Sequence, residues 1–433
     1  MSTTTVGVIG IILMVVLLFS RMPVAFVMAF LGVAGFAYLR DFPSASALLA
    51  TDLYTEFSHY GLTVIPLFVL MGQIAYYAGI SRRLYDSAYV LVGHLRGGLA
   101  IATVGACAAF SAVCGSTNAT AATMAVVTLP EMKRYGYDDA LATGTVAAAG
   151  SLGILIPPSV IFIVYGILTE QSIGKLFASG VIPGILLALM FVATVVIRVW
   201  LNPALAPAGE KTSIREKAMS FLGVGETLAL FIMVIGGMFL GIFTPTEAAA
   251  VGAALTLLIA VLRRQISWAD FVKSLLDTTR ISCMVMTIVA CATVFGHFMN
   301  VTFLPNRLAE WVVHLAIPPW AVMSLIIMIY LAGGCFMDSL AMIMLTVPIF
   351  YPVILQLGFD PIWFGVIIVL VTEMGVITPP VGVNVYVVAG IAKDVPLEKI
   401  FRGVLPMVVP LLILCALLIA FPRIALYLPS LMK

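Results

Sequence analysis

The sequence predicts an all-α polytopic membrane protein made of two inverted-topology repeats, each with a re-entrant helical hairpin and a broken transmembrane helix. Its 433 residues are 62% hydrophobic and 10% charged, with a mean hydropathy of +1.16, whereas soluble domains carry about 25% charged residues. Apolar stretches of bilayer length recur from end to end, which is typical of a bundle of transmembrane helices. The net charge is only +2, so the composition does not indicate nucleic-acid binding.

A short motif occurs once in each half of the chain, and each copy interrupts an apolar stretch. The first copy, GILIPP, covers 153–158, and the second, GVITPP, covers 375–380. A double proline cannot continue a helix, so we predict one broken helix in each half of the chain. Two unwound points at membrane depth are typical of carriers that hold an ion or a solute halfway across. Further pairs at the same offset are Ser116 with Asp338, Pro130 with Pro352, Gly136 with Gly358, and Asp138 with Asp360.

The positions of Lys and Arg predict the membrane topology of the first repeat, which we place at 1–201. Lys and Arg collect on the cytoplasmic side of short loops. The stretch 98–132 is too short for two spans of about 20 residues, is polar at its midpoint and precedes Lys133 and Arg134. We therefore predict a re-entrant hairpin that enters from the cytoplasm. The predicted order is helix 1 (5–20, ending at Arg21 inside), helix 2 (23–39), an amphipathic stretch (40–60), helix 3 (61–80, ending at Arg82), the hairpin, helix 4 (139–170, broken at 150–158) and helix 5 (180–200).

The second repeat, 219–433, follows a linker at 202–218 that includes Lys211. Each repeat has five predicted crossings, and an odd number requires the second copy to be inverted in the membrane. Its hairpin at 318–355 then enters from outside, and the loop after it, 356–360, has no Lys or Arg. The predicted elements are helix 6 (224–243), helix 7 (246–262), helix 8 (281–300), the second hairpin, helix 9 (361–391, broken at 372–380) and helix 10 (403–427, leaving the C-terminus outside).

Polar residues gather at the tips of both hairpins, and we predict that they contact substrate. The first tip carries Ser116, Thr117 and Asn118, and the second carries Asp338 and Ser339. Ser, Thr and Asn also favour turns and caps for purely local reasons. A carboxylate inside a membrane is costly, so it is a functional hypothesis by default, although structural capping is the alternative for Asp338.

The two helix breaks supply a second kind of ligand. A broken helix frees carbonyl oxygens at one end, which suit a hard cation, and N–H groups at the other, which suit a carboxylate. Ser159 and Asn384 follow the double prolines and are expected either to cap the resumed helix or to contact the substrate or an ion. Glu373 precedes the second break and is expected either to contact an ion or the substrate or to anchor the unwound turn. For Glu247 we favour capping of helix 7 over ligand binding. For His297 we favour packing between helices over a role in proton relay.

The sequence lacks the motifs that are typical of other classes of protein. No CxxC pair, no HExxH motif and no clustered nucleophile and base occur, so the sequence predicts neither an enzyme nor a transition-metal protein. The first apolar run is not preceded by Lys or Arg, so we expect a retained helix rather than a signal peptide. A channel is conceivable, but opposed hairpins on inverted repeats favour alternating access.

Several longer motifs accompany these residues. They are IPLF at 65–68 with Gly72, GHLRGGL at 93–99, GSTNATAAT at 115–123, LPEM at 129–132, GILIPPS at 153–159, FTPTEA at 243–248 and GVITPPVGVN at 375–384. With them, the chain resembles the large membrane subunit (DctM type) of tripartite ATP-independent periplasmic (TRAP) transporters over nearly its whole length. Where many members have two serines after the first tip glycine, this chain has Ser116 and Thr117, which keeps both hydroxyls.

The resemblance implies an elevator-type transporter in the bacterial inner membrane that imports an organic acid with Na⁺ as the coupling ion and no organic cofactor. It implies a first sodium site at Ser116, Thr117 and Asn118 with Gly153, Ile156 and Pro158. It implies a second sodium site at Gly334, Gly375, Thr378 and Val381. It also implies that Asp338 is the acidic residue that faces the substrate. The partners it implies are a small four-helix membrane subunit (DctQ type), expected as a separate protein, a periplasmic substrate-binding protein (DctP type), the small organic anion and membrane lipid.

A second interpretation stays open beside this one. A stand-alone Na⁺/dicarboxylate symporter of the divalent-anion type has a similar plan of hairpins and broken helices. The two differ in whether a small membrane subunit and a binding protein are required.

Overall fold

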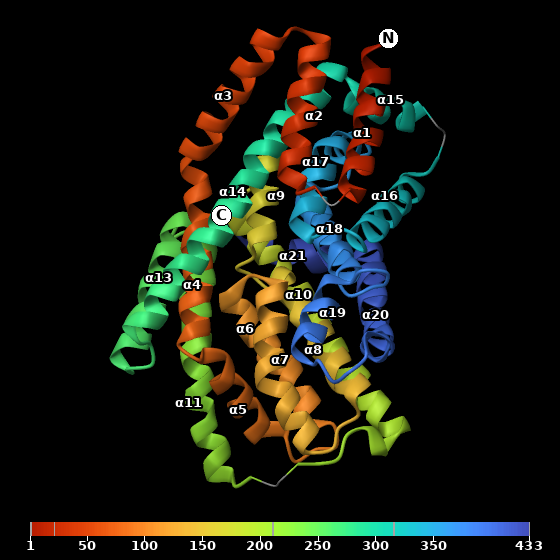
Figure 1. The fold of residues 1–433 in the computed structure, drawn as a ribbon. Coiled ribbons are helices and arrows are strands. Elements are labelled where there is room, and N and C mark those ends of the chain that lie inside the picture. Colours follow the sequence, from red (N-terminus) through yellow and green to blue (C-terminus); the bar gives the residue numbers. More distant parts are fainter. Residues whose placement is uncertain (1, 21, 210–211, 315–316, 433) are drawn as a thin grey trace.

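The computed structural model describes residues 2–20, 22–209, 212–314 and 317–432, and all the regular structure in these ranges is helical (Figure 1). The all-α prediction is therefore confirmed. Arg21 and Lys211, which entered the topology prediction, lie outside the described residues.

Two comparable series of helices follow one another along the chain. The first series is α1 (Thr3–Phe19), α2 (Val24–Leu39), α3 (Phe42–Ser58), η1 (Tyr60–Thr63), α4 (Val64–Tyr77), α5 (Ile80–Val92), α6 (Gly98–Cys114), α7 (Thr117–Arg134), α8 (Asp139–Leu155), α9 (Val160–Thr169) and α10 (Ile173–Leu201). A short 3-10 turn, η2 (Pro203–Leu205), follows. The second series is α11 (Ile214–Phe231), the π-helical turn η3 (Ile232–Gly236), α12 (Gly237–Phe239), α13 (Pro245–Leu262), α14 (Trp268–Thr302), α15 (Leu304–His314), α16 (Pro319–Gly334), α17 (Ser339–Gln356), α18 (Pro361–Gly375), α19 (Val383–Ile391), α20 (Leu397–Ala420) and α21 (Arg423–Leu431).

Seven helical segments of the described chain are long and apolar enough to cross a membrane, by length and composition. The most enclosed of them is 139–169, where 83% of the most apolar window is buried inside the protein, against 33% for α10 and α13. The α8–α9 segment is thus the centre of the bundle, and α10 and α13 lie at its outside. Six shorter apolar helices add to these spans, as expected of a multi-pass membrane protein.

Helix boundaries in the two series match at the offset seen in the sequence. α7 and α17 begin at Thr117 and Ser339 and end at Arg134 and Gln356, which is the spacing of the double prolines. Their N-caps are Ser116 and Asp338. The turns after them contain Gly136 and Gly358, which both have positive φ, +72° and +75°. The same start and stop signals therefore act at equivalent positions, while the opposite orientation of the halves in the membrane stays a prediction.

Both predicted helix breaks are present. α8 ends at Leu155 and α9 resumes at Val160, and α18 ends at Gly375 while α19 resumes at Val383. The peptide bonds Pro157–Pro158 and Pro379–Pro380 are both cis. Each interruption thus coincides with its double proline.

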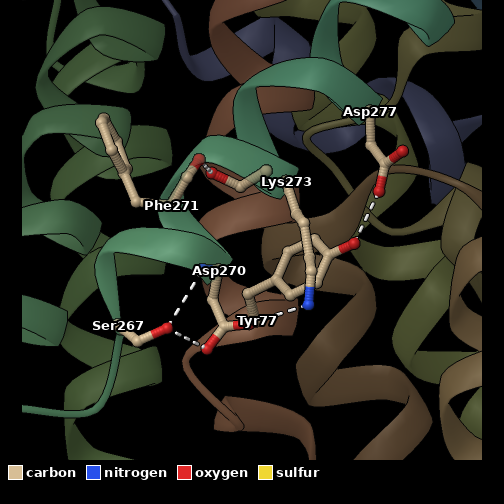
Figure 2. Close-up of polar contacts among 7 residues, drawn as sticks. Tyr77, Ser267, Asp270, Phe271, Lys273 and Asp277 are labelled. Carbon is tan, nitrogen blue, oxygen red and sulfur yellow. Dashed lines mark hydrogen bonds and ion pairs between the residues drawn. The ribbon is translucent and has the colours of Figure 1, made fainter.

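The structure differs from the prediction at α14, which begins at Trp268 and not near the expected position 281. Hydropathy marks only the apolar part of a helix, whereas the start is set by Ser267, whose hydroxyl accepts a hydrogen bond from Asp270 N at 3.1 Å. The polar first turns lie beside the end of α4, where the Tyr77 hydroxyl donates to Asp277 at 2.7 Å (Figure 2). Side-chain contacts with α4 therefore stabilise helical turns that lie outside the predicted helix.

Two amphipathic helices, α5 and α15, were also not predicted, because their charged residues resemble loop composition. α5 starts after Gly79, which has a φ of +68°, and it packs against α6 and α11. Predicted helix 10 is divided at Pro422 into α20 and α21. The breaks at 150–158 and 372–380 were predicted to begin too early, because 150–155 and 372–375 are still helical and the helices are interrupted only over 156–159 and 376–382.

The tightest crossing in the bundle joins α8 and α20 through glycines. A methyl group on Gly403 would overlap the carbonyl oxygen of Ala140, and one on Gly144 would overlap Gly403 itself. Small residues let membrane helices approach to backbone contact. The core of the first series is therefore completed by a helix from the second.

We expect Gly403→Ala to lower the free energy of unfolding by about 1–3 kcal/mol, the usual cost of overpacking. Gly390→Ala is the control, because a methyl group there has nothing within 4 Å. The thermal unfolding midpoints of both variants in detergent would test this. Equal midpoints would mean that α8 and α20 separate easily.

Candidate functional site

The tip of the first hairpin is a turn held by glycine. α6 ends at Cys114, Gly115 has a φ of +65°, and the Ser116 hydroxyl accepts a hydrogen bond from Ala119 N at 3.4 Å as the N-cap of α7. The Thr117 hydroxyl donates to Asn118 Oδ1 at 3.3 Å. A side chain on Gly115 would lie 2.6 Å from the carbonyl oxygen of Pro158. The tip thus rests directly on the first helix break.

The tip of the second hairpin has the same plan with an acid in place of serine. Asp338 caps α17 by accepting a hydrogen bond from Leu340 N at 3.1 Å, and the residue remains exposed. The hydroxyl of the next residue, Ser339, is buried and has no hydrogen-bond partner among the described residues. One capping bond therefore leaves further ligand capacity on both side chains.

The two tips meet in one cavity of about 100 Å³. Its polar lining comes from Ser116, Thr117 and Asn118 of the first tip, Asp338 and Ser339 of the second, and Gln73 of α4, and the remaining walls are mostly apolar. Five of the seven residues predicted to contact substrate therefore line one space, although the two tips belong to different halves of the sequence. A carboxylate, hydroxyls and amides in an apolar setting can bind a small polar solute by directed hydrogen bonds.

Ser159 and Asn384 do not line this cavity. Both are fully buried. The Ser159 hydroxyl caps α9, as expected, by accepting from Phe162 N at 3.5 Å. Asn384 does not cap α19, because it lies within that helix and the N-cap is Gly382; its Nδ2 instead donates to the Ala147 carbonyl at 3.2 Å. Their predicted contact with substrate stays a prediction.

The residues predicted for sodium form two groups, each where a hairpin tip touches a break. A methyl group on Gly153 would lie 2.5 Å from the Ser116 carbonyl oxygen, and one on Gly375 would lie 2.5 Å from the carbonyl carbon of Gly334. Main chain therefore meets main chain in both places, which is the arrangement needed for carbonyl ligands.

The other predicted sodium ligands lie within the breaks themselves. Ile156 and Pro158 are buried, and Thr378 and Val381 are half-buried. The Thr378 hydroxyl donates to the Met374 carbonyl at 2.6 Å, so its own oxygen lone pairs remain free to accept. Among the described residues, no three His, Cys, Asp or Glu side chains are grouped as a metal site.

The two breaks differ in exposure. Pro157 and Pro158 are buried, whereas Pro379 and Pro380 are exposed. The first break is enclosed by the protein, and the second is open at one side.

One polar pair at the breaks was not predicted. The Glu373 carboxylate is fully buried, and its Oε1 lies 2.7 Å from the Ser151 hydroxyl oxygen. Glu373 Oε2 has no hydrogen-bond partner in the described part of the chain. The repeat offset could have indicated this pair, because Ser151 and Glu373 are related by it in the same way as the two double prolines.

Two other acidic or basic residues have structural partners. Glu247 and Thr244 form the expected capping box at the start of α13, with Thr244 N donating to Glu247 at 2.8 Å. His297 Nδ1 lies 2.7 Å from Asp52 Oδ2, between α14 and α3. Neither Glu247 nor His297 lines the cavity at the hairpin tips.

Comparisons with known proteins agree on one family. Residues 11–424 match the family model described as "Tripartite ATP-independent periplasmic transporter, DctM component". The C4-dicarboxylate TRAP transporter large permease protein DctM of Pseudomonas aeruginosa is 39% identical over 90% of each chain. The isethionate TRAP transporter permease protein DctMQ of Oleidesulfovibrio alaskensis is 35% identical, covering 92% of this chain and 62% of its own length.

A solved structure shares the fold. The YdaH transporter of Alcanivorax borkumensis superposes with a TM-score of 0.64 at 17% identity, covering 90% of both chains. At this identity the likeness concerns the fold alone.

Proposed function

Because the chain belongs to the family of DctM components of tripartite ATP-independent periplasmic transporters, we propose that it imports an organic acid with Na⁺ as the coupling ion. The single observation that carries this proposal is the cavity at which both hairpin tips meet, Ser116–Asn118 on one side and Asp338–Ser339 on the other. A site shared by two hairpins can be opened from either side in turn, which alternating access requires.

The proposed substrate is a small organic anion: a dicarboxylate, a keto acid or a sugar acid. α7 and α17 both begin at the cavity, and helix N-termini favour negative charge. Thr117 and Asn118 would bind the substrate carboxylate in the first turn of α7. Asp338 would accept hydrogen bonds from donors on the substrate, such as hydroxyl groups. Relatives named for a C4-dicarboxylate and for isethionate support an anion.

The proposed sodium sites are the two tip-and-break contacts, centred on Gly153 and on Gly375. Their carbonyl-rich main chain suits a hard cation. We expect uptake to stop when Na⁺ is replaced by K⁺ or Li⁺, because these ions differ from Na⁺ in radius. Uptake of labelled organic acid into proteoliposomes with each cation outside would measure this, and undiminished uptake in K⁺ would exclude Na⁺ coupling.

The proposed motion is of the elevator type, in which the hairpins and broken helices move together. Ion pairs support a single moving body because they join the two halves. Lys399 contacts Asp139 at 2.7 Å, and Lys133 pairs with Asp394. The hydrogen bond from Lys133 holds the pKa of the Asp394 carboxyl below its usual value.

The proposed partners are a separate four-helix membrane subunit and a periplasmic substrate-binding protein. A relative whose name joins M and Q, the isethionate TRAP transporter permease protein DctMQ, supports a Q-type partner. Membership in a family whose description is tripartite supports a third component.

Proteoliposome uptake would test the assembly. The full chain would be reconstituted with and without a small membrane subunit, a binding protein loaded with labelled C4-dicarboxylate, and an inward Na⁺ gradient. We expect uptake only when all three are present. Uptake of free substrate by this chain alone would instead favour the stand-alone Na⁺/dicarboxylate symporter.

A further inference from the structure

Ser151 and Glu373 are equivalent positions of the two halves that contact each other. Their separation in the sequence is the offset that relates the double prolines, and the Ser151 hydroxyl oxygen lies 2.7 Å from Glu373 Oε1. Both side chains are fully buried. When two copies are related by a two-fold rotation, a residue meets its own counterpart only at the rotation axis. Under the predicted two-fold relation between the halves, this pair would lie on the axis, at the place where α8 and α18 pack together.

The pair is connected to both hairpin tips by short runs of chain. Ser151 is two residues before Gly153, whose added methyl would lie 2.5 Å from the Ser116 carbonyl oxygen of the first tip. Glu373 is two residues before Gly375, whose added methyl would lie 2.5 Å from Gly334 at the second tip. A continuous line of close contacts thus runs from one tip through both breaks to the other. The Ser151–Glu373 hydrogen bond is its middle link.

We propose that Ser151 and Glu373 are positioning residues that couple the two sodium sites to each other. An ion that orders the first break fixes the end of α8, and the hydrogen bond transmits that order to the end of α18 and hence to the second break. Binding of the second ion then costs less conformational entropy, which gives positive cooperativity. This inference rests on the proposed function, since it needs two sodium sites. Burying a carboxylate with one unpartnered oxygen is costly. We assign coupling of the two sodium sites as the function of the buried Glu373 carboxylate.

The test measures binding of radiolabelled Na⁺ to the purified full chain in lipid nanodiscs, without substrate. We expect a Hill coefficient approaching about 2 for the unmodified chain, because the Hill coefficient is bounded by the number of sites. Ser151→Ala and Glu373→Ala are expected to lower it toward about 1 and to weaken the tighter binding step by about 10-fold. Both ions should still bind at saturating Na⁺, because neither side chain is proposed as an ion ligand.

Ser179→Ala is the matched control. Ser179 is fully buried, and its hydroxyl donates to the carbonyl oxygen three residues earlier at 2.6 Å, as the Ser151 hydroxyl does. In the described chain, no hydrogen bond joins the Ser179 side chain to the other half. Its removal should leave the Hill coefficient unchanged. Glu373→Gln should also preserve cooperativity, because an amide can keep the hydrogen bond to Ser151.

The exchange variant Ser151→Glu with Glu373→Ser separates coupling from general damage. If the predicted two-fold axis passes between these positions, they can exchange side chains and form the same bond in reverse, so cooperativity should return. Cooperative binding in Ser151→Ala, or its loss in Glu373→Gln, would overturn the inference. An unmodified chain that binds no Na⁺ would instead overturn the proposed function, so the two failures are distinguishable.

Discussion

Replacing Asp338 with alanine is expected to abolish uptake while the protein still folds. The carboxylate is the only acidic side chain that lines the cavity among the described residues. A charge-assisted hydrogen bond contributes up to about 3 kcal/mol, so its loss would slow uptake by about 100-fold. The same change removes the N-cap of α17, which costs only about 1 kcal/mol of stability. Transport should therefore fail well before folding does.

Asp360→Ala is the matched control for that variant. Asp360 caps α18 through hydrogen bonds from Ile362 N and Trp363 N at 2.8 and 2.9 Å, but it does not line the cavity. It should lose stability without losing transport. Initial rates of uptake, with thermal unfolding of the same preparations, would separate the two effects. Uptake by Asp338→Ala at the rate of the unmodified chain would refute the assignment of this residue to the site.

Gly153→Ala is expected to impair sodium-dependent uptake by at least about 10-fold. The added methyl group would lie 2.5 Å from the Ser116 carbonyl oxygen and 2.7 Å from the Ser116 carbonyl carbon, closer than real contacts allow. The hairpin tip must then move off the break, and a displacement of about 1 Å is enough to disable a site. Because the tip main chain is a proposed sodium ligand, the Na⁺ concentration for half-maximal uptake should rise.

Gly105→Ala serves as the comparison, because Gly105 lies in α6 of the same hairpin and a methyl group there has nothing within 4 Å. Uptake measured over a range of Na⁺ concentrations would give both the maximal rate and the half-maximal concentration. A Gly153→Ala protein with unchanged Na⁺ dependence would show that the contact between tip and break is structural only.

The sequence was sufficient to predict the class of fold and most of its elements. Double prolines, glycines and capping residues act locally, so the helix pairs α6–α7 and α16–α17 and both helix interruptions could be predicted, while the re-entrant course of the pairs stays a prediction. The early start of α14 could not, because its polar first turns are supported by the contact between Tyr77 and Asp277, which are far apart in the sequence. The helices α5 and α15 were missed for a related reason, since their charged faces resemble loops until neighbouring helices are known.

The candidate site was predicted in part. The residues of both tips were identified by their polarity at the middle of apolar stretches, and the structure brings them to one cavity. Gln73 was missed because a single amide in an apolar helix carries no periodic signal. The Ser151–Glu373 contact depends on how α8 and α18 pack, and only the shared offset points to it.

The glycine crossing of α8 and α20 has a consequence for biogenesis. α8 is synthesised and inserted long before α20, because more than half of the chain separates Gly144 from Gly403. At about 5–20 residues per second, translation of that interval takes tens of seconds. During this time the most enclosed helix of the finished protein, with its unwound segment, must wait in the bilayer without its partner. Shielding of this half-made bundle by the insertion machinery or by lipid would then limit the yield of folded protein.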